Sequence, residues 1–225
     1  MKKITLMLAI LLSNLLAAQT FDVETIYTSG PDDKRINLVI LSDGYQKSEL
    51  TQFIKDATSF ANQLFSEIPY LEYKNYFNVY AIKVPSNESG AKHPGTATDV
   101  TEPLVPVLAV DNYFGSTFDS YDIHRLLFPT NFTAIYNVLA ANLPAYDQVI
   151  MLVNTPHYGG GGGSNIACVS MHPSANQIAI HELGHSFGIL SDEYYAGDVY
   201  AAESINMTQE TNPALVKWSN WMGTS

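Results

Sequence analysis

Two continuous apolar runs constrain the fold of this chain more than any other feature of its sequence. One run occupies residues 36–41 and the other residues 148–153, and both are rich in isoleucine, leucine and valine. Short apolar runs of this kind are typical of buried β-strands. Residues 77–84 alternate in polarity and predict a third strand.

Helical patterns lie between and after these strands. From Leu50 to Phe65 apolar residues recur three and four positions apart, which predicts a helix with one apolar face. Residues 123–143 also have a helical pattern, broken near Pro129. Residues 86–121 are rich in Ser, Gly, Pro, Thr and Asp and predict a long loop. The alternation of strands and helices predicts an α/β domain with helices packed on a sheet.

The composition excludes several classes of protein. Of the 225 residues, 46% are hydrophobic, which is enough for the core of one domain or two small ones. The 22 acidic residues outnumber the 11 basic ones, the formal net charge is −11, and no basic cluster is present. A nucleic-acid-binding surface is therefore not expected. With Cys168 as the one cysteine, no intrachain disulfide can form, so stability must come from packing or metal.

The N-terminus has the pattern of a secretory signal peptide. Two lysines precede an apolar run over residues 4–12, and small residues lead up to Ala18. We expect residues 1–18 to be removed, so that residues 19–225 are secreted, into the periplasm or outside the cell. The alternative is a membrane anchor or a buried first helix. The run is short for a bilayer span, and no second run is long enough, so stable membrane insertion is not expected.

The motif His-Glu-Leu-Gly-His at residues 181–185 points to specific chemistry. Residues four apart on a helix lie on nearly the same side, so the imidazoles of His181 and His185 can bind one zinc ion. Glu182 lies beside that face and can act as the general base toward zinc-bound water. The alternative is that the two histidines cap or pack the helix. Apolar flanks without proline favour the zinc site, and hence a zinc metallopeptidase with an HExxH active-site helix.

A third zinc ligand has to be found after this motif, because catalytic zinc sites usually have three protein ligands. Gly188 falls at the glycine of the metzincin pattern H-E-x-x-H-x-x-G-x-x-H, and it predicts a left-handed turn there. The third ligand of that pattern falls on Ser191, a poor ligand. Asp192 is our predicted third ligand and Glu193 the alternative. A further alternative is that both carboxylates orient a histidine or pair with a base.

Four stretches together resemble the bacterial IgA-peptidase-type zinc metallopeptidase family. The most specific is residues 181–195, which read His-Glu-Leu-Gly-His-Ser-Phe-Gly-Ile-Leu-Ser-Asp-Glu-Tyr-Tyr. Residues 40–45, residues 86–90 and the segment 153–160 agree with it. The resemblance extends from about residue 24 to about residue 221.

The resemblance implies a secreted zinc endopeptidase with a metzincin-like catalytic domain, a mixed twisted sheet with packed helices. It implies that His181 and His185 are zinc ligands, that Glu182 is the base and that Asp192 is the third ligand. Members of the family usually continue further, so the resemblance also carries the expectation of an incomplete C-terminus. It does not identify the substrate, immunoglobulin A included.

Two functions from different classes follow. The first is an enzyme that hydrolyses peptide bonds of extracellular proteins, with a protein or peptide as its partner. The second is a weak or inactive metallopeptidase fold that binds host or mucosal glycoproteins. The intact Glu182 favours the enzyme, because an inactive homologue tends to lose its base first.

Several other residues could contribute to a substrate cleft. The glycines at 159–163 predict either a rim beside an edge strand that pairs with a peptide backbone, or a flexible hairpin tip. Tyr194 and Tyr195 could donate a hydrogen bond to an oxyanion, although packing is the simpler role. His157 and His172 are close enough in sequence to reach the cleft, but a surface or core position is more common for a single histidine.

Acidic residues in the predicted loop permit a calcium interpretation. Asp111, Asp119 and Asp122 could supply oxygen ligands, but their spacing fits no defined calcium loop, so a solvated loop is favoured. His93 and His124 are the histidines least expected to take part in function.

Overall fold

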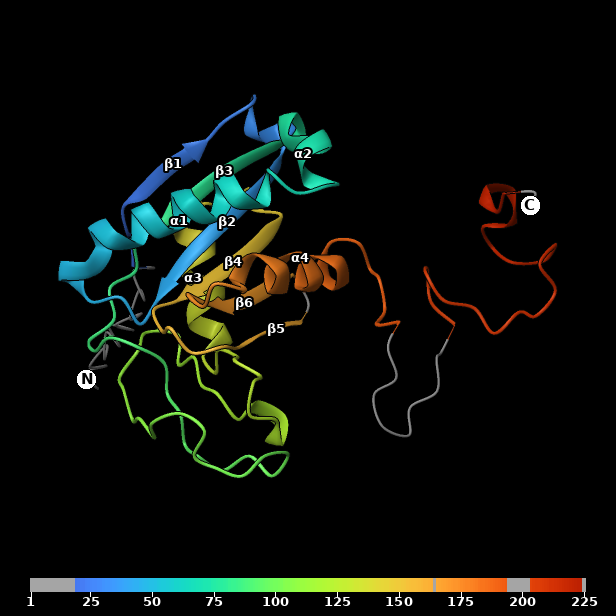
Figure 1. Cartoon of the computed structure of the whole chain (residues 1–225). Helices are drawn as coiled ribbons and strands as arrows, with labels where there is room; N and C mark the ends of the chain where they lie inside the picture. The colour runs from blue at the N-terminus through green and yellow to red at the C-terminus, as the bar shows by residue number, and fades with distance from the viewer. Residues whose placement is uncertain (1–18, 164, 194–202, 224–225) are drawn as a thin grey trace, which may run out of the picture.

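The computed structural model describes residues 19–163, 165–193 and 203–223 (Figure 1). Its strands are β1 (Val23–Tyr27), β2 (Ile36–Asp43), β3 (Phe77–Ile82), β4 (Gln148–Val153), β5 (Gly160–Gly163) and β6 (Ile166–Ser170). Its α-helices are α1 (Leu50–Leu64), α2 (Tyr70–Tyr73), α3 (Phe132–Asn142) and α4 (Ala175–Ser186). The predicted signal peptide lies outside the described residues. None of the described helices is both long and apolar enough to cross a bilayer.

The strands form one six-stranded sheet with the order β1-β3-β2-β4-β6-β5. Strands β2, β3, β4 and β6 are parallel to their neighbours in the centre of the sheet. The two edge strands, β1 and β5, are antiparallel to β3 and β6. The predicted α/β class is confirmed, and the three predicted strands correspond to β2, β3 and β4.

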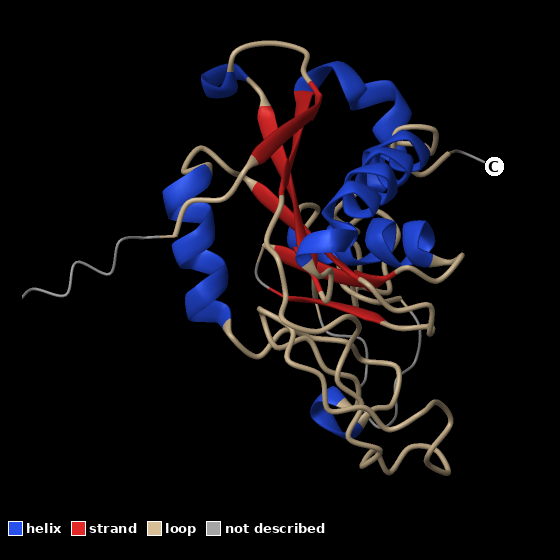
Figure 2. Cartoon of the chain, turned by 90° about the vertical axis from the view of Figure 1, so that its left-hand side faces the viewer, coloured by secondary structure: helices blue, strands red, loops and turns tan. Residues whose placement is uncertain are grey.

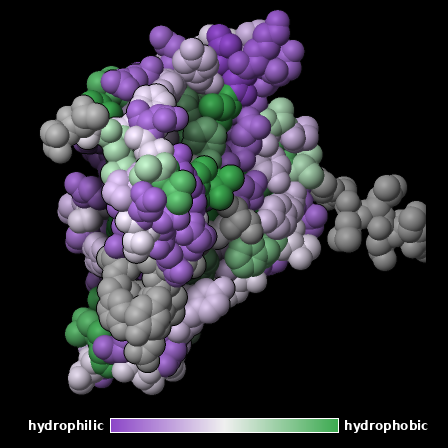
Figure 3. Space-filling model, turned by 90° about the vertical axis from the view of Figure 1, so that its right-hand side faces the viewer, coloured by the Kyte–Doolittle hydropathy of each residue, from purple (hydrophilic) through white to green (hydrophobic). Residues whose placement is uncertain are grey.

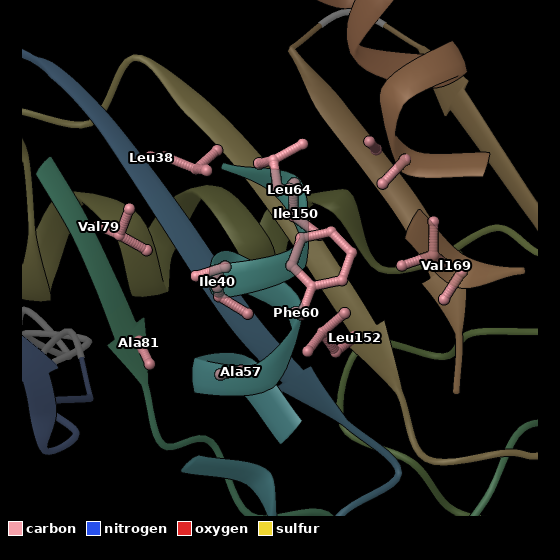
Figure 4. Close-up of a cluster of buried hydrophobic side chains, with 14 of the residues drawn as sticks. Leu38, Ile40, Ala57, Phe60, Leu64, Val79, Ala81, Ile150, Leu152 and Val169 are labelled. Carbon is pink, nitrogen blue, oxygen red and sulfur yellow. The ribbon is translucent and has the colours of Figure 1, made fainter. Parts of the chain in front are cut away.

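Helices cover the sheet on two sides (Figure 2). On one side, Leu38 and Ile40 of β2 belong to the same hydrophobic cluster as Phe60 of α1 (Figure 4). Ala179 and Leu183 of α4 belong to this cluster as well. Successive residues of a strand point to opposite faces, so the central strand needs apolar residues at every position. This explains the continuous apolar runs of the sequence.

On the other side of the sheet, α3 packs against the alternate residues of β2. Val39 and Leu41 share a second hydrophobic cluster with Ile135 and Leu139 of α3. The helix begins at Phe132, and the Asn131 side chain accepts a hydrogen bond from the Ala134 N–H, 3.2 Å away. The predicted break near Pro129 is confirmed, and α3 begins just after it at a good N-cap, but the helix predicted from residue 123 up to that break was wrong, because those residues belong to the loop layer.

Residues 86–131 form a loop layer below the sheet (Figure 1). The predicted long loop is confirmed, with one short 3-10 turn at Ser120–Asp122. Asp43, at the end of β2, is fully buried and anchors this layer. Its carboxylate accepts hydrogen bonds from the backbone N–H groups of Phe114 and Ser116, at 3.0 and 3.1 Å. Burial raises the pKa of Asp43, and these donors partly offset the cost of burying its charge.

Candidate metal centre

Helix α4 contains the whole motif at residues 181–185. Ala175, Ala179 and Leu183 recur every four residues and are buried against the sheet. His181 and His185 have the same spacing but lie on a different side, where 45% and 28% of their side chains are exposed. The helix therefore uses one face for packing and presents both imidazoles toward solvent.

The structure brings both imidazoles together with Asp192. The Nε2 atoms of His181 and His185 are 3.1 Å apart. The Oδ1 atom of Asp192 lies 3.2 Å from Nε2 of His181 and 3.3 Å from Nε2 of His185. We call these three residues the open cluster.

A tight chain reversal after α4 returns Asp192 to the histidines. The N–H of Gly188 donates a hydrogen bond to the carbonyl of Leu183, at 3.1 Å. The N–H of Leu190 donates one to the carbonyl of Gly184, at 2.9 Å. The left-handed residue is Ile189, with φ of 55°, and not Gly188 as predicted. Glycine is needed at 188 for another reason, because a Cβ there would lie 2.7 Å from the Gly184 carbonyl oxygen.

The hydrogen bonds of the open cluster are those of a cation site. Nδ1 of His185 lies 2.7 Å from the carbonyl oxygen of Leu190, and a carbonyl can only accept, so this nitrogen carries the proton. The Nε2 lone pair of His185 therefore faces His181 and Asp192. Within the described structure, Oδ1 of Asp192 is buried without a hydrogen-bond partner. Two imidazole nitrogens and a carboxylate oxygen that converge in this way fit a divalent metal such as zinc.

Asn206 holds the segment that carries Asp192. Its side chain accepts from the N–H of Ser191 and donates to the carbonyl of Ser191, both at 2.8 Å. It also donates to Oε1 of Glu193, at 3.0 Å. Glu193 is thus engaged with Asn206 and is not part of the open cluster. Sequence reasoning missed Asn206, because it lies 15 residues from Ser191 and belongs to no spacing motif.

Glu182 lies on the side of α4 that faces strand β5. A Cβ atom at Gly162 would lie 2.3 Å from Oε2 of Glu182, and one at Gly160 would lie 2.4 Å from Ile178. The glycines therefore form a strand that allows α4 to approach closely, and they are not the tip of the hairpin. Burial raises the pKa of Glu182, the charges of His181 and His185 lower it, and that of Asp192 raises it.

Two hollows adjoin the open cluster, and His181 borders both. The first, of about 490 Å³, is lined by Asp192, His185 and Asn206. The second, of about 690 Å³, runs between α4 and β5 and is lined by Glu182, Gly160 and Arg125. The arrangement leaves room beside the histidines for a molecule that contacts both Glu182 and a bound cation.

An apolar groove begins next to the first hollow. It lies between α2 and the end of α4 and is lined by aliphatic and aromatic residues, among them Tyr73, Tyr76 and Phe187. Ile180 and Leu190 border both the groove and the first hollow. Figure 3 shows hydrophobic side chains on the face of the molecule at which α4 ends.

The remaining sequence candidates have other positions. Tyr194 and Tyr195 lie outside the described residues. His157 and His172 belong to neither group of residues that could bind a metal within the described chain. Nδ1 of His172 instead accepts from the N–H of Ser174, at 3.1 Å. Cys168 is buried in β6, and burial raises the pKa of its thiol well above the usual value.

The interpretation of the acidic loop residues is only partly correct. Asp111 and Asp122 are exposed, as expected for a solvated loop. Asp119 is 8% exposed and lies beside His93 and His124, so the interpretation was wrong at this residue.

The α/β fold and the histidine pair of α4 are compatible with a peptidase domain. A family model described as IgA Peptidase M64 matches residues 24–225. The chain therefore belongs to the IgA Peptidase M64 family, as the resemblance implied. No curated protein matches the chain.

Proposed function

We propose that this protein is a secreted zinc-dependent endopeptidase that hydrolyses peptide bonds of extracellular proteins. The observation that carries the proposal is the convergence of Asp192 Oδ1 on both Nε2 atoms, at 3.2 and 3.3 Å. Three protein ligands beside a hollow are typical of catalytic zinc, which keeps a position open for water or substrate. When bound, zinc would lower the pKa of a coordinated water and polarise the substrate carbonyl.

Glu182 is the proposed general base. Its neighbours on α4 are the two histidine ligands, and it borders the same hollow as His181. Burial between α4 and β5 raises its pKa, and the neighbouring histidines lower it. Glu182 would take a proton from the attacking water and deliver it to the leaving amine.

The substrate is proposed to bind along the edge of the sheet. Strand β5 is an edge strand, and an extended peptide can add to such an edge through backbone hydrogen bonds. At Gly160 that edge is already paired with the segment at Leu126, while Gly161–Gly163 continue beyond this bridge. The groove at Tyr73 and Phe187 would accept an apolar side chain of the substrate.

The metzincin-like assignment is part of this proposal. It is supported by the spacing from His181 to Gly188 and by an antiparallel edge strand that lies against the active-site helix. The third ligand departs from the metzincin pattern, because it falls on Asp192, one residue later than expected. The tight reversal at residues 187–190 accommodates this difference.

The test is digestion of a peptide library by the zinc-loaded full chain, with cleavage sites identified by mass spectrometry. Glu182→Gln keeps the shape of the side chain and should lower the rate by about 10²–10⁴-fold while zinc stays bound. Glu193→Gln is the matched control and should retain activity. Equal hydrolysis by wild type and a verified Glu182→Gln variant would exclude the mechanism. A binding module would hold zinc and cleave nothing.

A further inference from the structure

A second group of histidines and carboxylates lies inside the loop layer, away from α4. It consists of His93, Glu102, Asp119 and His124, which we call the closed cluster. Each residue offers one ligand atom, and these atoms all lie within 4.8 Å of one another. The sequence separates them by up to 31 residues, so the fold brings them together and no local motif does.

The closed cluster is buried. The exposed fractions of the four side chains are 2% for His93, 9% for Glu102, 0% for Asp119 and 10% for His124. Nε2 of His93 and Oδ1 of Asp119 are buried and have no hydrogen-bond partner in the part of the chain that the structure describes. Buried polar atoms normally have hydrogen-bond or metal partners, so these two atoms indicate a binding site for a further group.

The geometry around His93 shows what kind of partner is missing. Nδ1 of His93 lies 3.0 Å from the carbonyl oxygen of Pro106, which can only accept, so Nδ1 carries the proton. Nε2 then presents a lone pair to Oε2 of Glu102, at 3.3 Å, and to Oδ1 of Asp119, at 3.4 Å. Three acceptors that face one another in a buried site repel each other unless a cation lies between them.

Asp119 and His124 are also oriented toward the centre of the closed cluster. Oδ2 of Asp119 accepts from the N–H of Thr96, at 2.7 Å, which leaves Oδ1 turned toward the cluster. Nδ1 of His124 contacts Glu102 and lies 3.4 Å from the same Oδ1. The backbone N–H of His124 is fixed by Asp99, at 2.9 Å. Ligands oriented by outer hydrogen bonds are a general property of metal sites.

We propose that His93, Glu102, Asp119 and His124 bind a second zinc ion, separate from the one at α4. Two imidazoles favour zinc over calcium, which prefers six or more oxygen ligands. Four protein ligands complete a tetrahedral shell, which is typical of structural zinc. Two carboxylates balance the charge of a divalent cation, so the filled site would be neutral in its buried position.

The second ion would stabilise the loop layer and, through it, one wall of the hollow next to Glu182. The residues after His124 pair with the glycine strand: Gly160 N–H donates to the Arg125 carbonyl, at 3.2 Å, and Leu127 N–H to the Gly160 carbonyl, at 3.3 Å. Arg125 and Leu126 also line the hollow next to Glu182. The loop layer has little secondary structure and no disulfide, so an ion that joins four of its segments would offset part of its ordering entropy.

The experiment is metal analysis of the purified full chain, loaded with zinc and freed of loosely bound metal. Wild type should contain two equivalents. His93→Ala combined with His124→Ala should leave one, His181→Ala combined with His185→Ala should also leave one, and the control His157→Ala should keep two. Limited proteolysis within residues 94–122 should accelerate in the first pair and not in the second.

The outcomes separate this inference from the proposed function. One equivalent in wild type that is lost only with the α4 histidines would overturn the closed site and leave the proposed function standing. One equivalent in wild type that is lost only with His93 and His124 would support the closed site and overturn the proposed zinc site at α4.

If the alanine pair does not fold, the folded wild type decides through X-ray absorption of its zinc. Two kinds of zinc site are expected, one of them with four protein ligands. A single kind of zinc site, with three protein ligands and water, would reject the closed site.

Discussion

The open and closed clusters use the same types of ligand but are built in opposite ways. The open cluster takes two histidines from one turn of α4 and Asp192 from a short reversal, and it borders two hollows. The closed cluster takes its four proposed ligands from separate parts of the loop layer and is buried. The helix places its cluster beside solvent-filled hollows, whereas the converging loops enclose theirs. This difference is the reason that we propose a catalytic zinc ion with three protein ligands for the open cluster and a structural one with four for the closed cluster.

The largest expected effect concerns the third ligand of the open cluster. Asp192→Ala should lower the zinc affinity of this cluster by more than about 100-fold, because losing a ligand costs more than losing an outer partner, which costs about 10–100-fold. Glu193→Ala should cost less, since its carboxylate contacts Asn206. Competition titration with a chelator measures both. The reverse order would move the ligand to Glu193, and small effects in both variants would place it elsewhere.

The second prediction tests the contact between strand β5 and Glu182. Gly162→Ala introduces a Cβ 2.3 Å from Oε2 of Glu182, so the carboxylate must move. Activity should fall by about 10²-fold, the cost of misplacing a catalytic group by about 1 Å. The unfolding free energy should fall by about 1–3 kcal/mol, because the new Cβ would also lie 3.0 Å from the Cβ of Glu182, which the backbone of α4 holds in place.

Gly163→Ala is the matched control for this strand. The nearest atom to its Cβ would be 3.9 Å away, on Phe128, which is an ordinary contact. Peptide hydrolysis and urea unfolding of both variants are the measurements. Equal activity in the two would show that Glu182 does not depend on the absence of a side chain at 162.

The third prediction tests the anchor of the loop layer, on which the closed cluster depends. In Asp43→Asn an amide N–H₂ has to face the N–H groups of Phe114 or Ser116, so at least one buried donor loses its acceptor. The expected destabilisation is about 1–3 kcal/mol. Urea unfolding measures it, and Asp111→Asn, at an exposed loop position, should have little effect. Equal stability of the two variants would mean that the layer is held elsewhere.

The smallest effect is expected at Asn206, which holds the residues on either side of Asp192 and lies outside the open cluster. Asn206→Ala removes both hydrogen bonds to the backbone of Ser191. Zinc affinity should fall by about 10-fold, the lower end of the range for outer residues. The control is Asn212→Ala, because among the described residues the side chain of Asn212 is hydrogen-bonded to the nearby N–H of Ala214. A loss as large as that of Asp192→Ala would make Asn206 part of the site itself.

Local patterns explain what could be predicted from the sequence. The central strands need apolar residues on both faces, so β2 and β4 are visible as continuous runs, and α1 is visible through its three-and-four spacing. His181 and His185 are a helical pair, and their meeting follows from helix geometry alone. The break at Pro129 was visible in the sequence, but the segment before it was wrongly predicted as helical, because apolar spacing alone does not distinguish it from the loop that the structure has there.

Longer-range features left no comparable signal. Asp192 reaches the histidines through a reversal whose left-handed residue is Ile189, a residue type that rarely adopts this conformation. Asn206 and the closed cluster depend on contacts between segments far apart in the chain. His93 and Asp119 show no spacing that indicates a shared site, and only the folded loop layer gives them one.

The part of β5 beyond the bridge at Gly160 also bears on which peptides the proposed enzyme would accept. Gly160 is paired with the segment at Leu126, so Gly161–Gly163 are the glycines whose backbone groups a peptide would meet, and those groups match every amino-acid sequence equally. A peptide paired with this strand would be bound through its backbone, without recognition of its side chains. Selectivity must then come from the opposite side, where the groove at Tyr73 and Phe187 has a size and polarity of its own. We expect cleavage sites that share an apolar residue at one position and vary freely at the positions next to the glycines.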